Sequence, residues 1–342
     1  MSAIASDTSD TLLEVDDLAV HFPLPRRHAF ARGDTVRAVD GVSFRIVRGR
    51  TFGIVGESGS GKTTTAQAVM GLVDTTAGTV RFDGVARDTL PAAARRAHRR
   101  DYQMIFQDPF SSLNPRLRVD ELVREPLDLM AIGTPPERRE RVTAMLDAVG
   151  LRPDQHRLFP HQFSGGQRQR ISIARALASS PKLVVCDEPV SALDVAIQAQ
   201  ILNLLARLQD ELQLTYLFIS HDLHVVRYLC DDIAVMYLGR IVEQTRADTI
   251  FDAPLHPYTW ALVSAIPGAS QAAGGRARVV LRGDPPSPTQ RLSGCRFAAR
   301  CPFAEARCRA EEPLLRPVSG GRAVACHRVD DQGIGPQHSL AS

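Results

Sequence analysis

The order of apolar and polar residues predicts strands that alternate with helices. Short apolar or alternating runs favour strands, and they lie at residues 12–22, 37–47, 51–55, 80–82, 183–186 and 215–219, with a further strand that ends at Phe106. Helical spacing of apolar residues marks 64–72, 90–100, much of 119–151, 168–178 and 195–209. Strands and helices in alternation predict an α/β fold.

The two ends of the chain lack this alternation. Residues 1–10 are small and polar, so we expect a disordered tail there. This tail also lacks the basic and apolar segments of a secretory signal, and we expect none. Residues 251–342 include a stretch rich in Pro and Arg with little strand or helix pattern, so we expect a small, irregular C-terminal region.

Length and composition narrow the class of protein. The 342 residues are enough for two domains, and 44% of them are hydrophobic, as in a globular core. No run approaches the roughly 18 apolar residues that a membrane-spanning helix needs. The net charge of +3 is too small to indicate a nucleic-acid partner. Lysine occurs only as Lys62 and Lys182, so a lysine inside a candidate site is informative.

A phosphate-binding loop is the strongest chemical signal in the chain. Residues 53–63 read GIVGESGSGKT, which satisfies the pattern G-x-x-x-x-G-K-[ST]. Glycines let successive backbone N–H groups form an anion nest, and the following helix adds the positive end of its dipole. Lys62 suits the β- and γ-phosphates, and the Thr63 hydroxyl suits Mg²⁺. We predict that a nucleoside triphosphate is bound by Gly56, Ser58, Gly59, Ser60, Gly61, Lys62, Thr63 and Thr64.

Two carboxylates and a histidine directly follow two later apolar runs. Asp187 and Glu188 end one run, and His221 comes after the next. Open α/β sheets place their chemistry at such strand ends. Asp187 suits Mg²⁺, and Glu188 can polarise an attacking water. A histidine after a strand is more often structural, but His221 shares its expected sheet edge with Lys62 and both carboxylates, which favours a functional role.

Three further features are less specific by themselves. Residues 163–167 read Phe-Ser-Gly-Gly-Gln and open a helix, which is a second anion-binding geometry. Phe22 ends the first strand, where an aromatic ring fits either stacking on a base or ordinary core packing. Gln107 follows a strand and alone indicates little.

Together, these residues resemble the ATP-binding subunits of ABC transporters. The resemblance implies a P-loop NTPase fold with a mixed sheet core, an ATPase domain at 11–250, a helical subdomain at about 108–175, and a C-terminal region at 251–342. In chain order, the matches are the Walker A loop at 56–63, the Q-loop Gln107, the signature at Ser164, Gly165, Gly166 and Gln167 (usually LSGGQ, here with Phe163 for Leu), Walker B at 183–187, the catalytic Glu188, the D-loop at 191–194 and the switch histidine His221.

The resemblance narrows to the ATPases of oligopeptide and dipeptide importers. It covers nearly the whole chain and includes MIFQDPFSSLNP, FPHQFSGGQRQR, CDEPVSALDVAIQAQ, HPYTWALVSAIP and GCRFAARCP. Relatives serve nickel and glutathione importers, so the cargo stays open. DNA-repair and chromosome ATPases of this fold carry a long coiled coil, and translation-associated ones carry two ATPase units. This chain shows neither a long heptad run nor a repeated motif, so both classes are disfavoured.

The resemblance also implies partners and a mechanism. Two ATPase subunits, siblings or identical, would sandwich two ATPs head to tail, each under the partner's Ser164-type signature. Glu188 would orient the attacking water, His221 would stabilise the γ-phosphate, and Gln107 would sense Mg²⁺. Closure would be relayed to two transmembrane permease subunits and, indirectly, to a substrate-binding protein. The expected location is the cytoplasmic face of the cell membrane, without insertion into it.

Four of the six cysteines crowd into one C-terminal stretch with the spacing C-x5-C-x6-C-x17-C, namely Cys295, Cys301, Cys308 and Cys326. Disulfides are disfavoured because the ATPase fold works in the reducing cytoplasm. Structural zinc usually shows two close cysteine pairs, which are absent here. The wide, uneven spacing and Cys301-Pro302 suit a [4Fe–4S] cluster better, and related peptide-importer ATPases carry such a cluster in this region. Zinc and free thiols stay open as alternatives.

Overall fold

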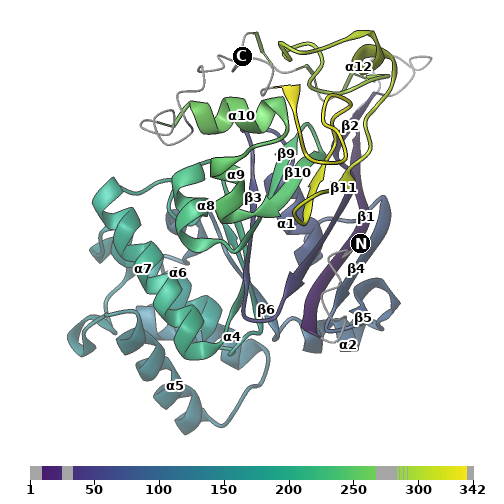
Figure 1. Cartoon of the computed structure of the whole chain (residues 1–342). Coiled ribbons are helices and arrows are strands. Elements are labelled where there is room, and N and C mark those ends of the chain that lie inside the picture. Colours follow the sequence, from purple (N-terminus) through teal and green to yellow (C-terminus); the bar gives the residue numbers. More distant parts are fainter. Residues whose placement is uncertain are drawn as a thin grey trace. The chain divides into compact units, whose positions relative to one another are not determined.

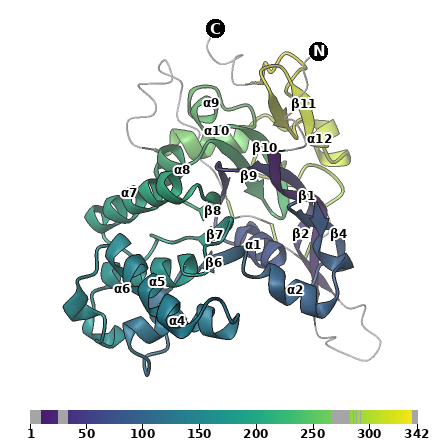
Figure 2. The same cartoon turned by 90° about the horizontal axis from the view of Figure 1, so that it is seen from below.

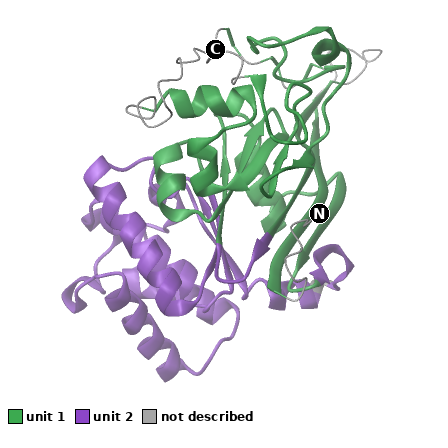
Figure 3. Cartoon of the chain, viewed as in Figure 1, with its two compact units in different colours: residues 1–45, 51–84, 220–342 green, residues 46–50, 85–219 purple. Residues whose placement is uncertain are grey.

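The computed structural model describes residues 10–24, 34–266, 283–284, 286–287, 289–290 and 292–336. The chain divides into two compact units (Figure 3): unit 1 comprises residues 1–45, 51–84 and 220–342, and unit 2 comprises 46–50 and 85–219. Strands and helices alternate through most of the chain, which confirms the predicted α/β class. The tail expected to be disordered, residues 1–10, lies outside the described residues except for Asp10.

Unit 1 contains an antiparallel sheet built mainly from the N-terminal strands. The strands β1 (Thr11–Pro23), β2 (Thr35–Val47) and β4 (Ala77–Phe82) lie in the order β2-β1-β4 (Figures 1 and 2). In β1, Leu13 lies opposite Phe82 and Val15 opposite Val80. All four side chains are buried, so this face of the sheet packs into the core of the unit.

A second set of strands in unit 1 runs in the order β11-β12-β10-β9-β3. These are β3 (Thr51–Val55), β9 (Asp232–Tyr237), β10 (Arg240–Arg246), β11 (Arg316–Val318) and β12 (Arg322–Val324). β3 pairs parallel with β9, and β12 pairs antiparallel with β10. The C-terminal region was expected to be small and irregular, and its described strands are short: β11 and β12 have three residues each, and β12 pairs with β10.

The described helices of unit 1 are α1 (Lys62–Met70), α8 (Leu223–Leu229), α9 (Ala247–Asp252), α10 (Pro257–Ser264) and α12 (Ala306–Ala310). Buried polar groups surround the start of α10. His256 caps α10 through its ring Nδ1, which accepts from the Tyr258 N–H at 3.0 Å. The buried Glu243 carboxylate accepts the N–H groups of Leu255 and His256, each at 2.8 Å. These bonds anchor the start of α10 to β10.

Unit 2 holds a parallel sheet in the order β8-β7-β6 and the helices around it. Its strands are β5 (Val85–Ala86), β6 (Tyr102–Ile105), β7 (Leu183–Asp187) and β8 (Thr215–Ser220, of which Ser220 is counted in unit 1). Its helices are α2 (Ala92–His98), α3 (Pro109–Ser112), α4 (Val119–Leu129), α5 (Pro135–Ala148), α6 (Gly165–Leu177) and α7 (Val195–Leu212), with 3₁₀ turns at Arg87–Thr89, Pro153–Gln155 and Pro160–Gln162. Every residue of β7 and β8 is buried, as is usual for parallel strands covered on both faces.

The helical stretch predicted at 119–151 is divided in two. Gly133, with φ of 70°, breaks the helical path, and Thr134 then caps α5 with Glu137 in a capping box. α6 begins at Gly165, three residues before the predicted start at Arg168, because Ser164 supplies its N-cap. Among the described residues, no helix is both long and apolar enough to cross a membrane.

Acid sensitivity should follow from the burial of His256. Burial lowers the pKa of His256 from 6.5 to about 3, so the folded protein keeps the ring neutral. Its contribution to stability is therefore complete above about pH 6.5 and falls as the pH drops towards 3. His256→Asn keeps an N-cap acceptor but does not titrate. When the pH falls from 7 to 5, the free energy of unfolding should therefore fall by about 2 kcal/mol less in His256→Asn than in the parent protein.

Urea unfolding of both proteins at pH 7 and pH 5 gives this difference. His224→Asn, on an exposed position, is the control and should leave the loss unchanged. Burial raises the pKa of Glu243 to about 7, an effect of opposite sign, but Glu243 is present in every variant. Equal losses in the parent and His256→Asn would contradict the account.

Candidate active site

The predicted phosphate loop lies in unit 1 between β3 and α1 and has the backbone that its glycines require. Gly59 and Gly61 have φ of 77° and 106°, in the region that favours glycine. A Cβ on Gly61 would come within 2.1 Å of the Ala38 carbonyl oxygen. Gly61 also precedes the first residue of α1, and no side chain caps that helix. The N–H groups of its first turn thus keep the positive end of the helix available to an anion.

Lys62 is the best-defined side chain of the loop. It is only 4% exposed, and its Nζ donates to the carbonyl oxygens of Gly56 at 2.8 Å and Glu57 at 3.0 Å. Nearby in the sequence, the Ser60 Oγ is buried and has no hydrogen-bond partner among the described residues. A buried ammonium, a buried hydroxyl and a helix N-terminus together suit the oxygens of a polyphosphate. The donor set therefore fits the predicted ligand.

The residues that hold this loop from the C-terminal region were not predicted from the sequence. The Glu57 N–H donates to the Tyr258 Oη at 2.9 Å, and Arg300 donates from Nη1 and Nη2 to the two Glu57 carboxylate oxygens at 2.9 and 3.2 Å. These partners lie 201 and 243 residues away in the sequence. The only sequence signal was an acidic residue inside a loop that otherwise attracts anions.

In unit 2, the predicted carboxylates follow β7. Asp187 is the last residue of that strand and is 4% exposed. Glu188 has φ of 46°, a left-handed conformation that is strained for a non-glycine residue. Its backbone N–H donates to the Ile219 carbonyl oxygen at 2.9 Å, which fixes it beside the end of β8. Such strain persists only where the surroundings enforce it, and it clusters at functional sites.

Two other predicted motifs meet Glu188. The Gln107 Nε2 donates to the Glu188 Oε2 at 2.9 Å, across 81 residues of sequence. The Ser191 hydroxyl, in the stretch that resembles the D-loop, donates to the Glu188 carbonyl oxygen at 3.1 Å. The structure thus brings Gln107, Glu188 and Ser191 together within unit 2. The resemblance implied a Mg²⁺-sensing role for Gln107, and its bond to Glu188 was not predicted.

Among the remaining predicted residues, Ser164, His221 and Phe22 are exposed, whereas Gly166 is buried. Ser164 caps α6, and its Oγ accepts from the Gln167 N–H at 3.4 Å while the Gln167 Oε1 accepts from the Ser164 N–H at 3.0 Å. His221 follows β8 in unit 1 and is exposed. Phe22 lies in β1 with 41% of its surface exposed, which argues against the core alternative and leaves base stacking as a prediction.

The four C-terminal cysteines are all described, and their thiols influence one another. Burial, together with the neighbouring thiols, raises the pKa of Cys301 to about 11 and that of Cys326 to about 12. The Cys295 N–H donates to the Cys308 carbonyl oxygen at 2.8 Å. However, the described part of the chain contains no group of three or more His, Cys, Asp or Glu residues arranged to hold a metal ion. A preformed single-ion site is therefore not present there.

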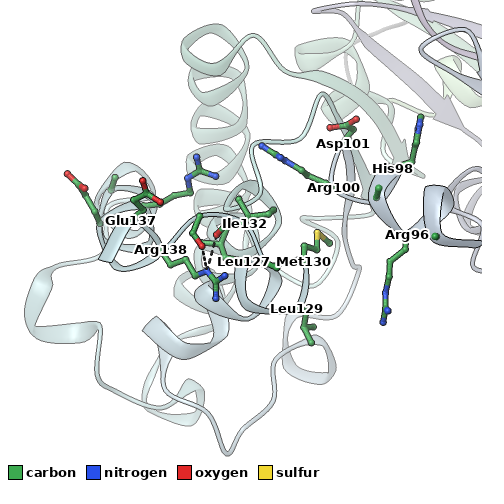
Figure 4. Close-up of a pocket in the computed structure, with 17 residues that line it drawn as sticks. Arg96, His98, Arg100, Asp101, Leu127, Leu129, Met130, Ile132, Glu137 and Arg138 are labelled. Carbon is green, nitrogen blue, oxygen red and sulfur yellow. Dashed lines mark hydrogen bonds between the residues drawn. The ribbon is translucent and has the colours of Figure 1, made fainter. Parts of the chain in front are cut away.

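A hollow in unit 2 lies apart from the predicted unit 2 site residues. It has a volume of about 1240 Å³ and lies between α2, the end of α4 and α5 (Figure 4). Arginines line it, and one of them, Arg138, pairs with Asp128 at 2.7 Å. None of the residues predicted to bind ATP lines it. The backbone of the phosphate loop is therefore a better guide to the nucleotide site than this hollow.

The chain matches known proteins over both its N-terminal and its C-terminal part. Residues 39–191 match the family described as ABC transporter, and residues 242–308 match the C-terminal region of oligopeptide/dipeptide transporters. The oligopeptide transport ATP-binding protein AppF of Bacillus subtilis is 47% identical over 322 residues, which are 93% of this chain and 97% of AppF. This chain belongs to the ABC transporter family of ATP-binding proteins. The predicted family and the predicted enzyme class, an ATPase, are confirmed.

Other relatives of this ABC protein agree. A Brucella ovis protein, provisionally named a peptide import ATP-binding protein, is 50% identical over 321 residues, which are 94% of this chain and 99% of the relative. Among solved structures, the ATP-binding cassette MJ0796, a dimer bound to ADP and Pi, has a TM-score of 0.61 and 29% identity and covers 69% of this chain and 99% of its own. CbiO1 of Clostridium perfringens, part of the transporter complex cbiONQ, also has a TM-score of 0.61 and 29% identity, with 71% and 91% covered. The predicted P-loop fold is thereby confirmed.

Lys62→Arg should abolish tight nucleotide binding by this ABC protein. The planar guanidinium cannot occupy the buried space in which a compact ammonium reaches two backbone carbonyls. Equilibrium titration with a fluorescent ATP analogue measures the effect. Lys182→Arg is the matched control, because Lys182 is the only other lysine and is exposed. Unchanged affinity in Lys62→Arg would show that the loop is not the phosphate site.

Proposed function

We propose that this ATPase powers the import of oligopeptides or dipeptides across the cytoplasmic membrane. The observation that carries the proposal is that similarity to peptide-transport ATP-binding proteins extends through the C-terminal region as well as the cassette. Cassettes in general share the ATPase motifs, so the C-terminal match is the part that is informative about cargo. Nickel or glutathione is the alternative cargo, because related ATPases serve those importers. We assign residues 11–250 to the ATPase domain and 251–342 to the peptide-importer-type region.

In the proposed function, the phosphate loop binds the nucleotide. Lys62 and the N–H groups at the start of α1 would hold the β- and γ-phosphates, and the buried Ser60 hydroxyl would gain an acceptor. The Thr63 hydroxyl, Asp187 and Gln107 would hold Mg²⁺. When bound, Mg²⁺ neutralises charge that develops on the phosphate oxygens. The exposed ring of Phe22 would stack on the base.

In the proposed function, Glu188 is the general base for hydrolysis. Its strained backbone and the bond from Gln107 fix its carboxylate, which would accept a proton from the attacking water. His221 would donate to the γ-phosphate as charge moves onto it. The Gln107–Glu188 bond also links the general base to the loop that begins at Gln107. A partner that moved this loop would therefore reorient Glu188.

The signature and the partners complete the proposal. Ser164, Gly165, Gly166 and Gln167 form a helix start at which Ser164 is exposed, which suits phosphate groups held on a second ATPase subunit. The dimeric neighbour MJ0796 supports this arrangement. We infer a sibling or identical ATPase partner, two transmembrane permease subunits and, indirectly, a substrate-binding protein, with this chain at the cytoplasmic face of the membrane. Nucleic acid is not among the inferred partners.

Glu188→Gln should reduce ATP turnover at least about 10²-fold while ATP binding is retained, because the amide cannot act as a base. The assay is phosphate release and labelled-peptide uptake by the transporter reconstituted in vesicles. Glu211→Gln makes the same chemical change on an exposed position of α7 and should alter neither. Near-normal hydrolysis by Glu188→Gln would remove Glu188 from the mechanism. Normal ATP hydrolysis by the parent without peptide uptake would reject the cargo.

We propose that Cys295, Cys301, Cys308 and Cys326 hold a [4Fe–4S] cluster. In such a cluster each cysteine binds a different iron, so the sulfurs need not converge on one point as they do around zinc. The mutual influence of the four thiols supports this donor set. The role would be structural or regulatory, because the cysteines lie outside every ATPase motif.

Protein purified without oxygen should be brown and should contain about four irons per chain if the cluster is present. Cys301→Ser should bleach the colour, whereas Cys230→Ser, outside the group of four, should not. Iron analysis and the visible spectrum measure this directly. Colourless anaerobic protein that holds one zinc, or no metal, would contradict the cluster.

A further inference from the structure

We propose that Tyr258 and Arg300 are positioning residues for ATP binding, which tie the C-terminal region to the phosphate loop through Glu57. This inference rests on the ATP site of the proposed function. Both residues touch Glu57 and act on the nucleotide through it. Tyr258 binds its main chain and Arg300 binds its side chain. All of these residues belong to unit 1.

The contacts bear directly on Lys62. The carbonyl oxygen of Gly56 and the N–H of Glu57 belong to one peptide group, which is planar. Its oxygen accepts from the Lys62 Nζ at 2.8 Å, and its N–H donates to the Tyr258 Oη at 2.9 Å. The bond to Tyr258 thus fixes the orientation of this peptide plane. The carbonyl oxygen in the same plane is the one that accepts from the Lys62 ammonium. The next carbonyl, that of Glu57, accepts from the same ammonium at 3.0 Å, and Arg300 restrains that residue by its side chain.

Tyr258 is held rigidly enough to do this. It is fully buried, and its own N–H is bound to the ring of His256. Its ring lies 4.7 Å from that of Tyr237 and 5.5 Å from that of Phe297. These three rings, with His256, form an aromatic cluster in which α10, β9 and residues 295–308, the cysteine segment, meet. A displacement of the cysteine segment would therefore reach the loop through packed rings.

Arg300 donates to the Glu57 carboxylate at 2.9 and 3.2 Å and, more weakly, to the Tyr237 Oη at 3.4 Å. Its side chain is 7% exposed, whereas that of Glu57 is 29% exposed. The Arg300 Nε is buried and has no hydrogen-bond partner among the described residues, which costs free energy. Two charge-assisted bonds to a single carboxylate fix an orientation. Since Cys301 follows Arg300 directly, the order of the cysteine segment and the geometry of the loop are coupled.

The test compares two arginines that each precede a cysteine. Arg300→Met keeps the length of the side chain but removes its bonds to Glu57. Arg307→Met is the matched control, because Arg307 precedes Cys308 and pairs with the exposed Glu311, which directly follows its helix. Titration with a fluorescent ATP analogue and Mg²⁺ should show binding about tenfold weaker for Arg300→Met and changed by less than about twofold for Arg307→Met. Tyr258→Phe, which removes one oxygen, should weaken binding in the same direction.

Two measurements distinguish coupling of Arg300 to the nucleotide through Glu57 from a general loss of stability. Glu57→Gln should weaken binding in the parent but add little in Arg300→Met, because the bond is already lost. By linkage, the ATP analogue should slow hydrogen exchange of residues 295–308 in the parent and not in Arg300→Met. Melting temperatures of all variants identify any that unfold, and Tyr258→Phe keeps the test available in that case.

The inference is overturned if Arg300→Met binds the analogue as tightly as Arg307→Met, or if the effects of Glu57→Gln and Arg300→Met simply add. It is also overturned if the analogue leaves exchange of the cysteine segment unchanged in the parent. A parent protein that does not bind the analogue at all would instead reject the proposed function. The two failures are therefore distinguishable.

Discussion

The burial of the Lys62 ammonium is the constraint on which the candidate site depends. A charged group that is 4% exposed is costly unless hydrogen-bond acceptors surround it. The carbonyl oxygens of Gly56 and Glu57 serve as acceptors only because the loop curls back over α1. That curl in turn requires glycine at position 61, where a Cβ would collide with a backbone oxygen. One buried charge therefore links the loop sequence, its backbone and its affinity for phosphate.

A second constraint operates in unit 2. Glu188 adopts a left-handed backbone, and its position is enforced by the Ile219 carbonyl and by the Gln107 amide. A general base needs a fixed carboxylate, and strain of this kind is a means of fixing it. In our account, Glu188 of unit 2 is the general base. The signature at Ser164 would then serve a nucleotide held by another subunit.

The sequence predicted the parts of the site that depend on local geometry. The phosphate loop, the helix start at Ser164 and the carboxylates after β7 each depend on a few consecutive residues, so their motifs were readable. Contacts between distant residues were not. The local sequences around these residues predict neither the Gln107–Glu188 bond nor the Glu57–Arg300 ion pair. Ion-pair partners are chosen by the fold, and any of the many arginines would have fitted the sequence equally well.

The C-terminal region shows the same limit. Its strands β11 and β12 have three residues each, too few for a period to be recognised, and they are strands because β12 pairs with β10 and β11 pairs with β12. The strands β9 and β10 and the helices α8, α9 and α10 were also not predicted as elements, although the stretch that contains α10, HPYTWALVSAIP, is part of the resemblance. The contribution of this region to the phosphate loop could be found only from the structure.

The dependence of affinity on phosphate number tests the central claim most directly. Calorimetric titration of the parent protein with ATP, ADP and AMP in the presence of Mg²⁺ separates contacts with the phosphates from contacts with the nucleoside. The account predicts tight binding of ATP and ADP and loss of binding for AMP, since the loop and Lys62 hold the β- and γ-phosphates. Equal affinity for ATP and AMP would contradict it, because the nucleoside would then provide the binding energy.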